Sequence, residues 1–199
     1  MRGRAVRPIA LAVALAAATA APAPARAEEP VAAEQELGAA LGVEAGGRVT
    51  PGGFNVLGNY LYQLSDEDWF DSGLSMTFGG GTPGCFRDRD DEILCDHGIT
   101  RGFAAEGFAG ARRFFPGQGV FAPYLRAALG ARLVSFRGDD VTGFALPLHL
   151  GGGIRARVAD GVAVVAGSEL RLGVGWFDRA LGAEPHISLA VHAGAEFAL

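Results

Sequence analysis

Two cysteines stand close together in this chain and could form a covalent cross-link. Cys85 and Cys95 are ten positions apart, and the chain has no other cysteine. In an exported protein such a pair predicts a disulfide, which would contribute up to about 3 kcal/mol in the chain-entropy model. A metal or redox role is the alternative, but the CxxC spacing typical of those sites is missing. We therefore expect Cys85 to bond to Cys95.

The segment between the cysteines is densely charged. Residues 87–92 read Arg-Asp-Arg-Asp-Asp-Glu, and Asp96 and His97 follow. Alternate acidic oxygens resemble a calcium loop, but the glycine and the terminal glutamate of an EF-hand are missing at their spacing. We interpret the segment as a solvated charged loop and expect no metal and no cofactor. A divalent cation that bridges this loop to lipopolysaccharide phosphates is the alternative.

Several titratable side chains have the types needed for acid–base catalysis. Glu106, His149, His192 and Glu196 are the candidates, and Ser188 is a candidate nucleophile. On one strand Ser188 and His192 would share a face about 13 Å apart, too far for a nucleophile to bond to its base. We therefore expect a polar interior without enzymatic activity, and we keep a lipid-modifying enzyme as an alternative.

The elements that position these side chains follow from a period of two. In residues 121–136 one register holds Phe121, Leu125 and Leu129, and the other holds Arg126 and Arg132. This alternation predicts a β-strand, longer than the usual 5–6 residues. The same pattern predicts eight strands in all: residues 36–48, 53–64, 69–78, 102–114, 121–136, 143–158, 161–176 and 185–199.

The charges of these strands fall on one face. The opposite face of the same strands is almost wholly apolar. A charge on a lipid-facing surface would cost about 2–4 kcal/mol at the midplane. We expect an all-β, eight-stranded antiparallel up-and-down transmembrane β-barrel that is apolar outside and charged inside. The predicted lumen charges are Glu44, Arg48, Asp71, Glu106, Arg112, Arg126, Arg132, His149, Arg155, Arg157, Glu169, Arg171, His192 and Glu196.

Two other kinds of barrel are compatible with the alternating pattern. A soluble periplasmic barrel would reverse the two faces. Eight strands leave an interior just wide enough for side chains, so a wide channel is not expected and a narrow pore stays open as an alternative. Arginine should block assembly at Leu129 or Leu148, which face lipid, and should be tolerated at Ala128, which faces inward.

The predicted connections alternate in length, as in membrane barrels. Short turns are expected at residues 65–68, 115–118 and 159–160, and outward loops at 49–52, 79–101, 137–142 and 177–184. Aromatic residues near strand ends suit interfacial girdles. They are Phe54, Trp69, Phe70, Phe114, Phe115, Phe121, Trp176 and Phe177.

The first residues predict export. Residues 1–27 have a basic start, an apolar run over residues 9–21, and an Ala-Arg-Ala ending, which is the pattern of a cleaved signal peptide. Residues 28–35 are then a short lead and 36–199 the barrel. Cleavage removes four of 17 basic residues and no acidic one, so 13 basic residues face 22 acidic ones, a formal charge of −9. We expect no nucleic-acid partner, because a basic patch is missing.

At this point the chain resembles the small outer-membrane barrels of the OmpA/OmpX type. The resemblance rests on eight strands, the loop asymmetry, the Phe-Ala-Pro-Tyr opening at residues 121–124, and the last strand. That strand is similar to the assembly signal that such barrels present to their insertion machinery: here His192, Gly194, Phe197 and Leu199, where phenylalanine is the commoner last residue.

The resemblance implies a monomer in the outer membrane of a Gram-negative cell, in contact with outer-membrane lipids and lipopolysaccharide. It implies a structural or surface-interaction role with an external ligand that the sequence does not name. A narrow, porin-like transport barrel is the chief alternative, since fold does not give function.

Overall fold

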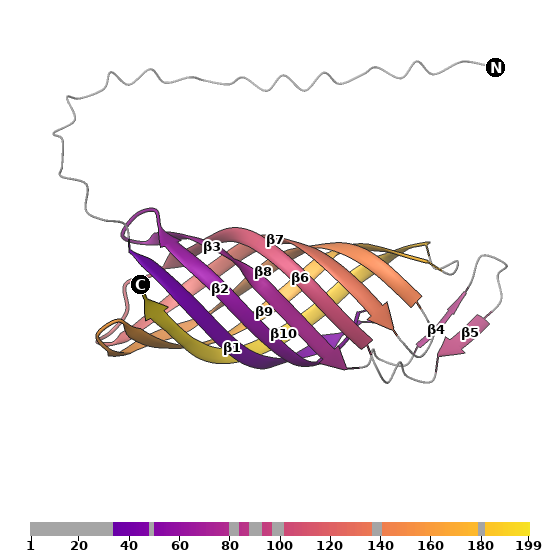
Figure 1. The fold of residues 1–199 in the computed structure, drawn as a ribbon, viewed down its shortest axis with the longest axis horizontal. Coiled ribbons are helices and arrows are strands. Elements are labelled where there is room, and N and C mark those ends of the chain that lie inside the picture. Colours follow the sequence, from indigo (N-terminus) through magenta and orange to yellow (C-terminus); the bar gives the residue numbers. More distant parts are fainter. Residues whose placement is uncertain are drawn as a thin grey trace, which may run out of the picture. The chain divides into compact units, whose positions relative to one another are not determined.

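The computed structural model describes residues 34–47, 50–79, 102–136, 141–178 and 182–199 with their side chains, and residues 84–87 and 93–96 by their backbone. Among these residues, eight strands close into a barrel in the order β1-β10-β9-β8-β7-β6-β3-β2, and each runs antiparallel to both neighbours (Figure 1). The barrel strands are β1 (Gln35–Gly46), β2 (Gly53–Gln63), β3 (Asp68–Gly79), β6 (Gly102–Phe114), β7 (Phe121–Phe136), β8 (Val141–Ala159), β9 (Val162–Phe177) and β10 (Gly182–Ala198).

The predicted fold class is confirmed. Each predicted strand matches an observed one, with ends that differ by three residues or fewer. Barrel strands that follow one another in the chain are neighbours in the barrel wall, which is an up-and-down topology. The alternating sequence pattern succeeded because successive side chains of a strand point to opposite faces.

One pair of strands was not predicted. β4 (Gly84–Arg87) and β5 (Ile93–Asp96) form a separate two-stranded sheet within the segment that we expected to be only a loop. Its register sets Cys85 directly opposite Cys95. Residues opposite each other in an antiparallel pair are at a Cα separation that a disulfide can bridge, so the bond stays a prediction with a suitable backbone. Residues 88–92 and His97 of the acidic segment lie outside the described residues.

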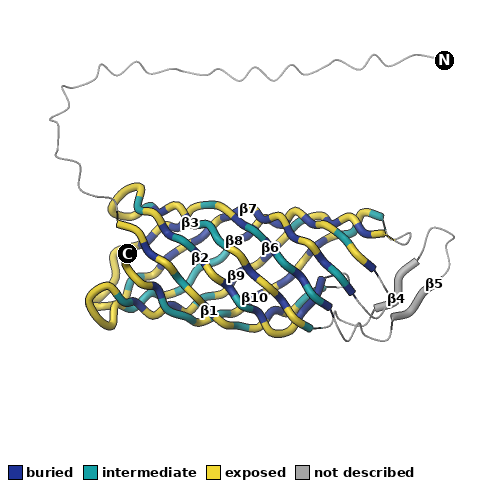
Figure 2. Tube along the Cα trace, in the orientation of Figure 1, coloured by how far each residue is buried: buried dark blue, intermediate teal, exposed yellow. Residues whose placement is uncertain are grey.

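Burial alternates along the barrel strands as the sequence pattern requires (Figure 2). In β7, Leu129 is 69% exposed whereas Arg132 is fully buried. Leu125 and Leu133 of the same strand are exposed, and Arg126 is buried. The apolar face of the sheet therefore points outward and the charged face points into the barrel, the reverse of a soluble barrel.

Aromatic side chains mark both ends of the outer surface, with one correction to the prediction. At one end Phe78 and Phe103 are in contact, with their ring centroids 5.4 Å apart and the rings tilted by 50°. Trp69, Phe114 and Phe177, which we expected in the girdles, are buried inside the barrel instead. Exposed aromatic residues near the strand ends are Phe54, Phe78, Trp176, Tyr62, Phe70, Phe115, Phe121 and Phe197.

The connections place three turns at the barrel end where β1 begins and β10 finishes. They are residues 64–67, 115–120 and 160–161, and the connections at the other end are 47–52, 80–101, 137–140 and 178–181. The length asymmetry between the two ends rests almost wholly on residues 80–101. Within the described part of the chain, no helix is long and apolar enough to cross a membrane.

Candidate functional site

The interior of the barrel holds a continuous set of ion pairs, which we call the lumen network. Every barrel strand except β2 contributes a charged group to it, because the inward register of each of those seven strands carries arginine, histidine or a carboxylate. Within the described lumen its members are Glu36, Glu44, Asp71, Glu106, Arg112, Arg126, Arg132, His149, Arg155, Glu169, Arg171 and Glu196.

Glu44 is the centre of one half of the network. Its carboxylate oxygens lie 2.8 Å from Arg132 Nη1 and 3.1 Å from Arg171 Nη1. Thr77 Oγ1 donates to Glu44 Oε2 at 2.6 Å, and Asn55 Nδ2 donates to Thr77 Oγ1 at 2.9 Å. All five side chains are buried. A carboxylate removed from water is stabilised only when paired and hydrogen-bonded, and Glu44 has both kinds of partner.

His149 joins the carboxylates of two strands. Its Nδ1 lies 2.9 Å from Glu169 Oε1, and its Nε2 is in ion-pair contact with Glu106 Oε1. Glu106 Oε2 also lies 3.2 Å from Arg132 Nη1, and Glu169 Oε1 lies 2.8 Å from Arg171 Nε. With both imidazole nitrogens protonated, the six cations of the described lumen network equal its six carboxylates.

Arg112 and Arg126 extend the network toward the barrel end that holds the three turns, which we call the turn end. Arg112 donates to Asp71 Oδ2 from Nε at 3.0 Å and from Nη2 at 2.8 Å, and it is in contact with Glu196. Arg126 Nε lies 3.0 Å from the same Asp71 oxygen, and Arg126 Nη1 contacts Glu169. Asp71 therefore connects the two halves of the network.

Arg155 ends the network at the mouth of the barrel. Its Nε lies 3.2 Å from Glu196 Oε2, and its Nη2 contacts Glu36. Glu36 was not among the predicted lumen charges, although it occupies the inward register of β1 eight residues before Glu44. The predicted first strand began at this residue, and the signal that could have found it was the same alternation.

Apolar clusters fill the spaces between the charges. Three arginines lie over aromatic rings: Arg126 is 4.2 Å from the centroid of Phe108, Arg112 is 4.7 Å from that of Tyr124, and Arg155 is 5.2 Å from that of Phe114. Such cation–π contacts stabilise guanidinium groups away from water. The clusters are Ala104, Val134, Phe136, Val141 and Phe177; Ala40, Leu57, Phe108 and Ala128; and Leu61, Trp69, Phe114 and Tyr124.

Glycines allow the side chains that fill the lumen to pack directly against the backbone of the barrel wall. A Cβ atom at Gly167 would lie 2.5 Å from the Tyr124 hydroxyl and 2.9 Å from the Gly152 carbonyl oxygen. Ala128 is also enclosed: it is 3% exposed and belongs to a cluster with Ala40, Leu57 and Phe108. This burial argues against the expectation that Ala128 tolerates arginine, which stays a prediction.

The remaining predicted residues are placed differently. Arg48 lies outside the described residues. Arg157 is exposed at the mouth instead of buried, and His192 is half-buried. Of the assembly-signal residues, Phe197 and Leu199 are exposed, and Gly194 packs against Ala40.

The structure keeps Ser188 and His192 on one strand, as the sequence pattern indicated when we judged them too far apart to act as nucleophile and base. Ser188 and His192 stay four residues apart along β10. A different histidine, His186, shares a 3.2 Å hydrogen bond with Thr50 Oγ1, and both residues are fully buried. Among the residues that the structure describes, no cluster of three or more histidine, cysteine or acidic side chains could hold a metal ion.

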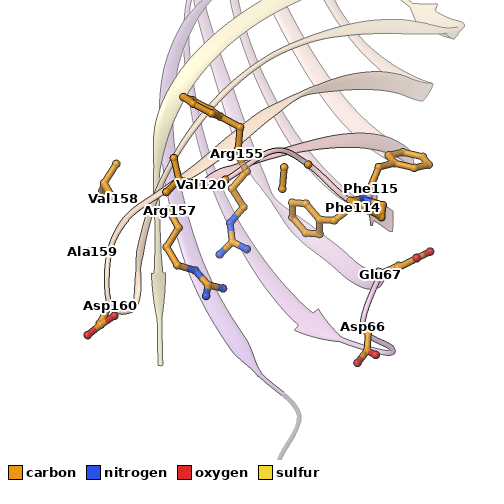
Figure 3. Close-up of a pocket in the computed structure, with 15 residues that line it drawn as sticks. Asp66, Glu67, Phe114, Phe115, Val120, Arg155, Arg157, Val158, Ala159 and Asp160 are labelled. Carbon is orange, nitrogen blue, oxygen red and sulfur yellow. The ribbon is translucent and has the colours of Figure 1, made fainter.

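A cavity of about 600 Å³ opens at the turn end of the barrel. Its walls come from the three turns, from the last residues of β8 and from the first residues of β7. Figure 3 shows the side chains of Arg155 and Arg157 lying between the turn that carries Asp160 and the turn that carries Asp66 and Glu67.

Solved structures resemble this arrangement. Neisserial surface protein A (NspA) matches with a TM-score of 0.54 at 17% identity, over 83% of this chain and 96% of that one. The N-terminal β-barrel domain of Pseudomonas aeruginosa OprF matches with a TM-score of 0.52 at 13% identity, over 84% of this chain and 99% of that one. The chain has the fold of the small eight-stranded outer-membrane barrels. This outer-membrane barrel fold is shown by structure alone, since no protein-family model and no curated protein matches the sequence.

Proposed function

We propose that this chain is an outer-membrane β-barrel with a structural or surface-interaction role, a plugged interior and exposed loops. The observation that carries the proposal is the reversed polarity of the wall. Leu129 and Leu133 are more than 60% exposed on the outer face of the strand that buries Arg132 completely on its inner face. An outer surface of this kind is stable in lipid, where a closed barrel leaves no backbone group unpaired.

The filled interior supports a structural role over transport. The lumen network and the three apolar clusters occupy the described lumen from Phe136 and Phe177 at one end to Trp69 and Phe114 at the other. A pore would require several of these buried ion pairs to separate, and each such separation is costly in a low-dielectric interior. The narrow-pore alternative is therefore the less favoured one.

The route to the membrane is part of the proposal. The predicted signal peptide lies outside the described residues, and its cleavage after Ala27 would release the lead and barrel into the periplasm. The last strand would then be recognised by the insertion machinery through His192, Gly194, Phe197 and Leu199. Outer-membrane lipids and lipopolysaccharide are the proposed surroundings of the barrel wall, and the protein acts there as a monomer without enzymatic activity.

Two measurements on one preparation test the proposal. Detergent-extracted outer membranes are run on a gel boiled and unboiled, and the purified protein is then examined by planar-bilayer recording. We expect an unboiled form with altered mobility, which indicates a closed barrel, and no stable conductance steps. Release of the protein with the periplasm would contradict the membrane location, and regular conductance steps would favour the narrow pore.

A further inference from the structure

The cavity at the turn end joins the inside of the barrel to its outer rim. Arg155, Arg157 and Phe114 belong to the inward register of their strands, whereas Phe121 and Val158 are exposed on the outward one. All five line the same space. A molecule in this cavity can therefore place a polar group at the mouth and an apolar portion against the lipid-facing surface.

The mouth supplies one cation that the lumen network does not use. Arg155 is already paired with Glu36 and Glu196. Arg157 is exposed, lies two residues further along β8, and forms no ion pair among the described residues. In Figure 3 its guanidinium lies within the cavity, beside that of Arg155. This arrangement offers a positive charge to an anionic group that enters from the turn end.

The turns around the cavity supply the opposite charge. Asp66, Glu67 and Asp160 all line it. Glu67 lies 3.8 Å from Arg113 Nε on the outer surface, so part of its charge is already compensated there. Asp66 and Asp160 remain at the edge of the cavity, on either side of Arg157 (Figure 3).

We propose that this cavity holds one amino-phospholipid, with its phosphate at Arg157 and its ammonium group at Asp66 or Asp160. Its acyl chains extend along Phe121 and Val158 into the adjoining leaflet. The site rests on the proposed membrane location, because only a membrane brings such a lipid to the barrel rim. Because membrane barrels have short turns on the periplasmic side, this lipid would be a specific partner in the periplasmic leaflet.

The charge pattern selects this occupant over two simpler ones. A phospholipid with a phosphate and no ammonium group would pair with Arg157 but would leave Asp66 and Asp160 facing another anion. A free phosphate ion would have the same difficulty and would leave the apolar rim formed by Phe121 and Val158 without a contact. An ammonium phospholipid satisfies the cation, one of the two carboxylates and the rim together.

Lipid retention measured by native mass spectrometry tests the site. The mature protein in detergent is mixed with equal amounts of dioleoyl phosphatidylethanolamine and dioleoyl phosphatidylglycerol, and the bound lipid is counted. Wild type is expected to retain the ethanolamine lipid preferentially. Arg157→Gln should lower that retention about threefold to fivefold, the value of a partly exposed ion pair. Arg113→Gln is the control, since Arg113 is an arginine at the same end that does not line this cavity. It pairs with Asp68 and lies 3.8 Å from Glu67, so its loss frees a carboxylate and should not lower retention of the ethanolamine lipid.

Two further measurements test the ammonium contact and the apolar contact separately. The double variant Asp66→Asn/Asp160→Asn should keep lipid binding but lose the preference for ethanolamine over glycerol. Excess inorganic phosphate should leave the lipid bound, because phosphate cannot contact the rim. Displacement by phosphate would show a site for free anions and overturn the proposal.

Other outcomes also overturn it. Equal retention of the ethanolamine lipid by wild type and Arg157→Gln would show that Arg157 does not bind it. A loss of retention in Arg113→Gln as large as that in Arg157→Gln would show that the effect is not specific to the cavity. Equal binding of the two lipids by wild type would remove the ammonium contact. Heat-modifiability is measured on the same samples: a folded, membrane-inserted barrel that fails the lipid test refutes this inference alone, whereas a protein that does not insert refutes the proposed function.

Discussion

Arg132 Nη1 lies 2.8 Å from Glu44 Oε1, although the two residues are 88 positions apart in the chain. Glu44 is on β1 and Arg132 is on β7, four strands away in either direction around the closed barrel. The pair therefore spans the lumen between opposite walls. Arg112 of β6 and Glu196 of β10 are related in the same way. Such contacts close the interior and hold the wall in one shape.

Removing one partner of the Arg132–Glu44 pair should be strongly destabilising. We expect Arg132→Met to lower the free energy of unfolding by about 3–5 kcal/mol, because a buried carboxylate loses a cation. Denaturant unfolding of the barrel in lipid vesicles, followed by the loss of heat-modifiability, measures this change.

The double variant distinguishes pairing from packing. Glu44→Gln/Arg132→Met removes both charges, so it should be more stable than Arg132→Met alone. A double variant whose destabilisation equals the sum of the two single changes would show that the two groups do not interact.

The effect of an introduced arginine on membrane insertion should depend on the face of the strand and on the space available there. Leu129→Arg puts a charge on the lipid-facing surface and should cost about 2–4 kcal/mol near the midplane, which lowers the yield of inserted protein. Ala122→Arg is the control, because Ala122 lies on the inward face of the same strand and lines the turn-end cavity. Ala128→Arg should fail as well, through overpacking. Equal membrane yields of Leu129→Arg and Ala122→Arg would show that the assignment of faces is wrong.

The glycine next to the Tyr124 hydroxyl, Gly167, should be sensitive to a single methyl group. Gly167→Ala places a Cβ 2.5 Å from the Tyr124 hydroxyl and should destabilise the barrel by about 1–3 kcal/mol through overpacking. Tyr124→Phe removes the hydroxyl and should restore part of that loss, since the contact with the Gly152 carbonyl oxygen remains. Unfolding midpoints of the two single variants and the double variant measure the effect. Lack of any rescue would mean that the backbone contact alone sets the cost.

The disulfide between Cys85 and Cys95 can be tested without a structure. The oxidised protein, denatured without reductant, should not react with a thiol-specific reagent, and it should gain two labels after reduction. The facing register of the two cysteines on β4 and β5 is the basis of this expectation. Labelling of both cysteines before reduction would refute the bond.

The sequence alone determined the wall of this protein. Alternation at period two assigned Leu129 outward and Arg132 inward, and the strand ends followed to within three residues. It did so because the direction of a side chain on a strand depends only on its position in that strand. The same rule places Glu36 in the lumen and assigns three aromatic residues to the inside of the barrel: Trp69, Phe114 and Phe177. The girdle prediction missed them because it used aromatic character near strand ends in place of register.

Only the tertiary structure decided which inward side chains meet. The pairs Arg132–Glu44, Arg112–Glu196 and His149–Glu106 join strands that the chain sequence separates widely, and their contacts depend on barrel closure and on the relative heights of the strands. The closed barrel also decided that Ala128 is buried against Ala40, Leu57 and Phe108, whereas Arg157 lines an open cavity at the end of the barrel. A strand pattern fixes the direction of each side chain, but the space at the end of that side chain is set by seven other strands.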